Sequence, residues 1–196
     1  MHYVDKICKL FLLLVLFRAD LSAQTATTVS GYPVIDLSAL NPLGAVLSSA
    51  EASSRRTLMN QQTPSNTAYL GVGSSVSGYN GTWNAKMSPR YQVMRSNISS
   101  GTDWANAWTL CRNYSGEGGS AGAWRLPTTR ELQMIWVLQP QLMGKGSFNA
   151  LTSSGYYWTG SEGSGTTAGD MSFSSGGTWT GDSKTSSYQV RCIRDI

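Results

Sequence analysis

The chain has 196 residues, of which 15 are Lys or Arg and 11 are Asp or Glu, so its net charge is +4. The basic residues are scattered and form no run longer than Arg55-Arg56, whereas nucleic-acid binding requires a clustered basic patch. The only histidine is His2, which excludes a Ser-His-Asp triad, a Cys-His pair and a histidine-containing zinc site from the remaining chain. We therefore expect a protein that is not an enzyme and needs no metal and no cofactor.

Residues 1–23 have the pattern of a secretory signal peptide. Lys6 and Lys9 precede an apolar run of eight residues, and Leu21-Ser22-Ala23 is typical of a cleavage site. The run is too short for a transmembrane helix, which needs about 20 residues. Because three basic and two acidic residues leave with this segment, the net charge of the mature chain falls from +4 to +3. We expect a secreted or extracellular protein without a membrane span.

Two cysteines, Cys111 and Cys192, remain after this cleavage. In an exported chain an even pair favours a disulfide, and two cysteines allow only one intramolecular pairing. The alternative is two buried free thiols. A bond that closes a loop of this size would stabilise the fold by about 4 to 5 kcal/mol.

Residues 24–87 form a segment rich in Ser, Thr, Asn, Gln and Gly, in which Pro33, Pro42 and Pro64 interrupt the short apolar clusters. This composition predicts an N-terminal extension or small subdomain with one or two short strands. Whether the segment folds independently stays open at this stage.

Residues 88–196 show clear strand and helix signals, and we predict that they form the main domain. A short strand is expected at 91–94, and Thr102 can cap a helix whose Trp104, Trp108 and Cys111 share one face. A second helix is expected after Thr128, which forms an S/T-x-x-E capping box with Glu131.

The remainder predicts strands. These are expected at 156–158, around Met171 and Phe173, and from Tyr188 to Arg194, with a hairpin turn at Gly176-Gly177. Two helices followed by an antiparallel, loop-rich sheet predict an α+β domain.

Three separated motifs in this domain resemble one bacterial family. They are W-R-L-P-T-x-x-E-L at 124–132, Y-W-x-x-S/T-E at 157–162 and V-R-C-x-R-D at 190–195. In this order they resemble the C-terminal domain of a collagen-like bacterial adhesin. The resemblance implies a C-type-lectin-like fold, in which a cysteine on the first helix pairs with one on the last strand, as Cys111 and Cys192 would.

The resemblance also implies relatives among surface adhesins and fimbrial tip proteins. The acidic sugar-binding loop of the calcium-dependent lectins is absent, because Gln139-Pro140-Gln141 lacks the acid and no Trp-Asn-Asp follows. The placement of the motifs further suggests an ion pair between Glu162 and Arg191 or Arg194.

Residues 160–188 are the expected binding face, because 20 of the 29 positions are Gly, Ser or Thr with a few larger side chains among them. Aromatic rings held among small polar residues are typical of adaptable binding loops. The alternative is a long solvated hairpin whose Trp179 packs on the sheet. The candidate ligand-binding residues are Asp170, Phe173, Trp179, Asp182, Lys184 and Tyr188.

Three functions remain open. The first is a non-catalytic, adhesin-like binding module for a glycan or for a host or surface protein. The second is a structural or tip subunit of a fimbria-like assembly, with fimbrial subunits as partners. The third and weakest is a glycan-active enzyme that uses two carboxylates.

Overall fold

The computed structural model describes residues 25–39, 45–70, 86–174 and 178–196. The predicted signal peptide at 1–23 and the predicted turn at Gly176-Gly177 lie outside the described residues. Within the described part, no helix is both long and apolar enough to cross a membrane.

One of the two sheets contains five strands in the order β1-β2-β3-β10-β5, and every described pair in it is antiparallel. The strands are β1 (Thr25–Val29), β2 (Tyr32–Asp36), β3 (Arg90–Val93), β5 (Trp124–Arg125) and β10 (Ile193–Asp195). Strand β2 is hydrogen bonded to β3, so the described N-terminal strands are built into the same sheet as the predicted main domain.

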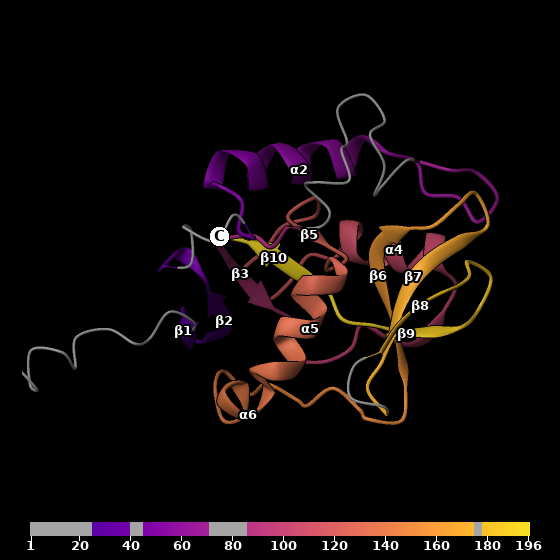
Figure 1. Ribbon diagram of the computed structural model, residues 1–196. Helices are drawn as coiled ribbons and strands as arrows, with labels where there is room; N and C mark the ends of the chain where they lie inside the picture. The colour runs from indigo at the N-terminus through magenta and orange to yellow at the C-terminus, as the bar shows by residue number, and fades with distance from the viewer. Residues whose placement is uncertain (1–24, 40–44, 71–85, 175–177) are drawn as a thin grey trace, which may run out of the picture.

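The other sheet also contains five strands, in the order β4-β9-β6-β7-β8. The strands are β4 (Ser99–Thr102), β6 (Tyr156–Glu162), β7 (Thr167–Ser172), β8 (Thr178–Ser183) and β9 (Tyr188–Val190). All neighbours are antiparallel except β6 and β9, which run parallel. Figure 1 shows the two sheets on opposite sides of helix α5.

The described residues contain four α-helices. They are α2 (Ser49–Gln61), α4 (Trp104–Asn113), α5 (Thr129–Val137) and the short α6 (Gln139–Leu142). Sequence patterns predicted α4 and α5 but not α2, whose polar surface gives little amphipathic signal. Helix α4 is capped by Asp103, which accepts a hydrogen bond from the Asn106 amide, and not by Thr102 as predicted.

The capping box predicted for α5 is confirmed. The Thr128 hydroxyl accepts a hydrogen bond from the Glu131 amide at 3.2 Å, and the Glu131 carboxylate accepts one from the Thr128 amide at 2.8 Å. Leu132 and Ile135 turn the apolar side of this helix into the core. Trp136 is only half-buried and stacks on Phe173, with ring centroids 4.4 Å apart.

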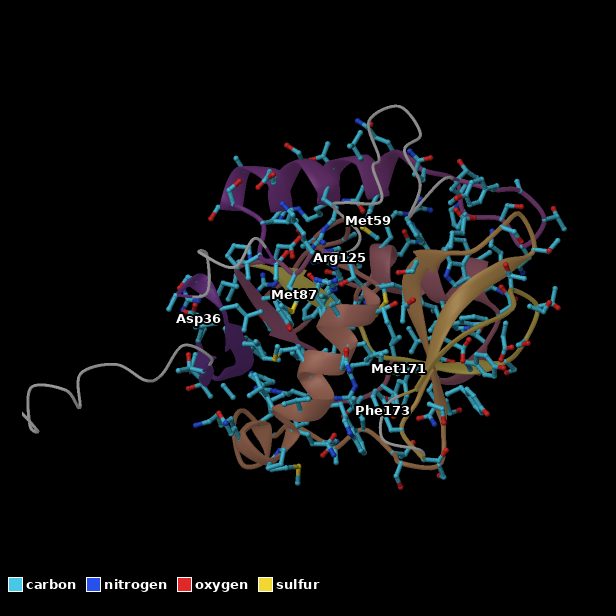
Figure 2. All side chains as sticks on the ribbon, viewed as in Figure 1. Asp36, Met59, Met87, Arg125, Met171 and Phe173 are labelled. Carbon is cyan, nitrogen blue, oxygen red and sulfur yellow. A yellow bond between two sulfur atoms is a disulfide. The ribbon has the colours of Figure 1, made fainter. Side chains whose placement is uncertain are left out.

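Two apolar clusters form the core. The larger joins α5 to both sheets, and Met171 and Phe173 lie in it between β7 and α5 (Figure 2). The smaller surrounds α4 and contains the rings of Trp104, Trp108 and Trp158. The structure thus confirms the inward-facing side predicted for α4.

The predicted disulfide between Cys111 and Cys192 is confirmed. The single strand predicted from Tyr188 to Arg194 is wrong, however, because β9 and β10 belong to different sheets. The chain crosses between the sheets at Arg191 and Cys192, where the Cys192 carbonyl accepts a hydrogen bond from the Met94 amide. The disulfide therefore ties α4 to the crossing point between the sheets.

The predicted α+β class is confirmed in its coarse form. The architecture is richer than two helices and one antiparallel sheet, since it has four described helices, two sheets and one parallel strand pair.

Candidate functional site

Three of the six candidate ligand-binding residues lie in the interior. Asp170, Phe173 and Lys184 have relative exposures of 0%, 2% and 0%. Their side chains are therefore not at the surface where a ligand could touch them. A Gly-rich and Ser-rich composition does not show which face of a strand is buried, and this is why the sequence pattern grouped them with surface residues.

Lys184 has a structural role. Its ammonium group forms an ion pair with Glu162, donates to the carbonyls of Ser65 and Ala68, and lies 4.5 Å from the centroid of a Trp104 ring. These contacts hold the segment that follows α2 against the second sheet. The backbone amide of Leu70 donates to the same Glu162 carboxylate.

The predicted pairing of Glu162 with Arg191 or Arg194 is wrong. Arg191 donates to the Asn97 side chain and to backbone carbonyls, including that of Met94. Arg194 bonds the Gly118 carbonyl and the Gln92 side chain in the first sheet. Since Glu162 ends β6 in the second sheet, Lys184 on the same sheet is its partner.

The last two described candidates, Asp182 and Tyr188, contact each other. The Tyr188 hydroxyl donates to Oδ2 of Asp182 at 2.5 Å, and both side chains are half-buried. The pKa of Tyr188 is raised to about 12, mainly because the phenol is partly buried and secondly because it donates this hydrogen bond. The backbone of Trp179, the sixth candidate, lies opposite Met171, and its side chain is outside what the structure describes.

Tyr156 lies beside Tyr188 on the same surface. The sequence analysis placed it in a strand but did not include it among the candidate ligand-binding residues. Its ring stacks on Tyr188 with centroids 4.9 Å apart and planes inclined by 23°, yet 42% of the residue remains exposed. Tyr188 also contacts the buried ring of Trp158, at 4.7 Å. We call Tyr156, Tyr188 and Asp182 the tyrosine face.

The β-strand period could have revealed Tyr156. Tyr156 and Trp158 are two residues apart and so lie on one side of β6, and Tyr157 points to the other, where it joins the larger core cluster. A strand that begins with three aromatic residues must direct its first and third rings to the same side.

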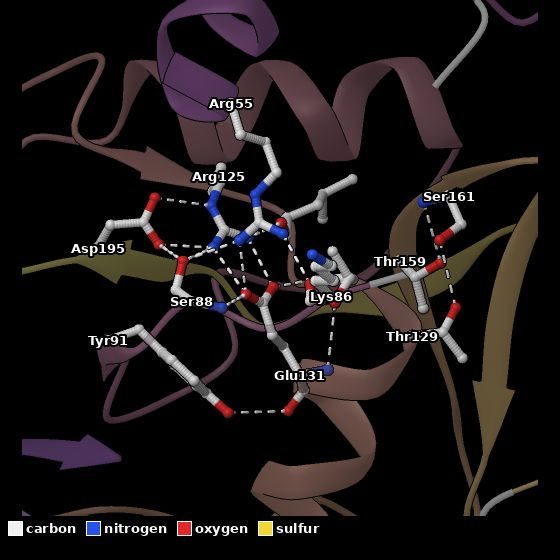
Figure 3. A network of polar contacts seen from close by, with 12 residues as sticks. Arg55, Lys86, Ser88, Tyr91, Arg125, Thr129, Glu131, Thr159, Ser161 and Asp195 are labelled. Atoms are coloured by element: carbon white, nitrogen blue, oxygen red, sulfur yellow. Dashed lines mark hydrogen bonds and ion pairs between the residues drawn. The ribbon is translucent and has the colours of Figure 1, made fainter. Parts of the chain in front are cut away.

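Charged residues of the first and third motifs converge elsewhere, in a buried polar network (Figure 3). Arg125 donates to the carboxylates of Glu131 and Asp195, with shortest distances of 2.7 and 2.6 Å. Arg55 on α2 donates to Glu131 at 2.7 Å and to Ser88 at 2.8 Å. The five side chains join α2, α5 and the first sheet.

The electrostatics of this network match a structural role. The two arginines outweigh desolvation and hold the pKa of Glu131 well below its usual value. Two guanidinium groups and two carboxylates balance in charge, and all four side chains are almost completely buried. The network is thus an interior ion cluster, in which both carboxylates are bound by arginines.

A hollow of about 210 Å³ lies beside the network, between α2 and the last residues of the chain. Its lining includes Ser53, Arg56, Arg90 and Ile196. None of the six candidate residues borders it.

No group of three or more metal-ligating His, Cys, Asp or Glu side chains occurs within the described residues. The tyrosine face contains one carboxylate, that of Asp182, which accepts the hydrogen bond of Tyr188. This arrangement offers an aromatic ring and a carboxylate to a ligand.

No curated protein matches the chain. A family model described as the Lcl C-terminal domain matches residues 75–194, which is more than half of the chain. This range contains the first two motifs, the third motif up to Arg194, and the tyrosine face. The chain therefore belongs to the Lcl C-terminal domain family.

Proposed function

We propose that the protein is a secreted or surface-displayed binding module without catalytic activity, which recognises a glycan or a protein ligand through the tyrosine face. Membership of the Lcl family supports a bacterial surface or secreted location, as does the leader-like sequence at 1–23. A C-type-lectin-like fold is part of the same proposal, supported by the motif order and by the disulfide between α4 and the crossing before β10.

The observation that carries the proposal is the exposed ring of Tyr156 on a rigid base. Because Tyr188 stacks on this ring and is itself bonded to Asp182, the ring is ordered before any ligand arrives. Preordered aromatic side chains contribute large contact areas at a low entropic cost. A polar acceptor beside an aromatic ring is the arrangement that orients a ligand with both an apolar side and donor groups.

A binding screen tests this function. The purified protein is applied to an array of glycans and extracellular-matrix proteins, together with a Tyr156→Ala variant. We expect at least one ligand to bind and Tyr156→Ala to weaken it by about tenfold or more, as for an aromatic anchor.

The matched control is Tyr69→Ala. Tyr69 has a similar exposure of 46% but precedes Leu70, which is bonded to Glu162 at the opposite end of β6. This control should retain binding. Equal binding by wild type and Tyr156→Ala would overturn the proposed face, and a fully negative array would overturn the binding function.

A subunit of a fimbria-like assembly is the second candidate. Strand β1 is at the edge of the first sheet and, among the described strands, pairs with β2 alone. An open strand edge can accept a strand from another chain. Concentration-dependent assembly in sedimentation experiments would favour this role, and a strictly monomeric protein would exclude self-assembly.

A further inference from the structure

The tyrosine face is locally acidic although the chain as a whole is basic. The charged side chain in contact with Tyr188 is that of Asp182, an acid whose Oδ2 accepts the hydrogen bond of the phenol. The nearest lysine in sequence, Lys184, is fully buried and paired with Glu162, so its charge is neutralised in the interior. A ligand that meets this face therefore meets an aromatic ring beside negative potential.

We propose that the tyrosine face takes a glycan with free amino groups, in which a deacetylated hexosamine stacks on Tyr156 and directs its ammonium group to Asp182. This inference rests on the proposed binding function and names the ligand class for the same site.

Three features of the face match this chemistry. The apolar C–H side of a pyranose ring fits the exposed ring of Tyr156, as rings at binding surfaces favour flat apolar partners. An ammonium group is attracted both by an aromatic face and by a carboxylate. Acetylation of the same sugar removes its positive charge and therefore its attraction to the Asp182 carboxylate.

The hydrogen bond between Tyr188 and Asp182 prepares the carboxylate for this role. Since the pKa of Tyr188 is raised to about 12, the phenol stays protonated and continues to donate at physiological pH. The bond occupies Oδ2 of Asp182 and fixes the orientation of the group before binding. Asp182 thus acts as a contact residue and Tyr188 as a positioning residue.

The experiment compares two oligosaccharides by calorimetric titration of the purified protein. One is a hexamer of β-1,4-linked glucosamine, and the other is the fully N-acetylated hexamer of the same length. We expect the amine form to bind about tenfold more tightly, a difference typical of a hydrogen bond to a charged group. Added salt should reduce this difference, because partly exposed charges are screened.

Two variants assign the effect to the face. Asp182→Asn should weaken binding of the amine hexamer about tenfold and leave the acetylated hexamer unchanged, whereas Tyr156→Ala should weaken both. Asp36→Asn is the matched control, because Asp36 is a partly buried acid on β2 of the first sheet, whereas the tyrosine face lies on β6, β8 and β9 of the second sheet. It should have no effect.

If Asp182→Asn does not fold, Tyr188→Phe keeps the ring and removes only the bond to Asp182, and it should weaken amine binding several-fold.

Failure of this inference is distinguishable from failure of the proposed function. Equal binding of the two hexamers, lost in Tyr156→Ala, would overturn the ammonium assignment and leave the binding face intact. No binding of either hexamer by a protein that binds another ligand on the array would also overturn it. A protein that binds nothing on the array would overturn both.

Discussion

Arg125 and Glu131 form a two-pronged ion pair, in which the Nη1 and Nη2 atoms of the guanidinium donate to the two carboxylate oxygens at 2.7 and 2.9 Å. Both residues belong to one sequence motif, six positions apart. The pair fixes the start of α5 against β5, because Glu131 also accepts the Thr128 amide in the capping box. A motif that identifies the family is therefore a folding device in this chain.

Glu131→Gln should strongly destabilise the protein. The substitution leaves the buried guanidinium of Arg55 without its carboxylate and reduces Arg125 to its bonds with Asp195 and neighbouring groups. Removal of one partner of a buried ion pair costs about 3 to 5 kcal/mol. Chemical denaturation followed by tryptophan fluorescence measures the free energy of unfolding.

The chain offers a matched control in its other capping box. Glu51 holds the same position in α2, where it accepts the Ser48 amide at 2.8 Å, but it lies at the surface. Since glutamine also serves at this position, Glu51→Gln should cost no more than about 0.5 kcal/mol. Equal costs at the two sites would contradict the importance of the buried network.

Glu131 should also make stability depend on pH. Its pKa in the folded protein is well below the ordinary value of 4.5, because Arg125 and Arg55 stabilise the carboxylate. In acid the unfolded chain therefore binds the proton first, so stability falls as pH decreases. This contribution is complete above about pH 5 and is lost progressively towards about pH 2. Melting temperatures across this range should fall less steeply in Glu131→Gln, and an unchanged slope would exclude Glu131 as the source.

The parts of the fold that follow local rules were predictable from sequence. The box at Thr128 and Glu131 needs only neighbouring residues, and the apolar side of α4 follows from the spacing of Trp104, Trp108 and Cys111. The disulfide was predictable because two cysteines allow one internal pairing. These signals do not depend on the arrangement of distant segments.

The remaining features depend on contacts between distant segments. The burial of Arg55 was not predictable from the sequence, because its carboxylate partner, Glu131, is 76 positions away. Lys184 resembled a surface lysine for the same reason, since its contacts come from Glu162 and from Ser65 and Ala68. The tyrosine face was found only in part, because pairing of β6 with β9 brings Tyr156 to Tyr188.

The disulfide should contribute a large part of the stability. Cys111 and Cys192 are 81 positions apart, and closing a loop of this length restricts the unfolded chain by about 4 kcal/mol. A Cys111→Ala, Cys192→Ala double variant should unfold at a correspondingly lower denaturant concentration. Both cysteines are fully buried, so reductant should act on the wild type only where unfolding exposes the bond. A double variant as stable as the wild type would show that the core alone determines stability.

Lys184 and Glu162 should be strongly coupled, since both side chains are fully buried and form one ion pair. Lys184→Met leaves the Glu162 carboxylate buried with the Leu70 amide as its described donor, and should cost about 3 to 5 kcal/mol. Adding Glu162→Gln removes that buried charge, so the double variant should recover roughly 2 kcal/mol relative to additive effects. Lys145→Met is the control, because Lys145 forms no ion pair in the part of the chain that the structure describes.

Hydrogen exchange gives a local measurement of the same coupling. The Leu70 amide should exchange faster in the Lys184→Met protein, because the Glu162 carboxylate that accepts its hydrogen bond is no longer held by Lys184. Additive single effects, or an unchanged exchange rate at Leu70, would mean that the segment before residue 70 is held by other contacts.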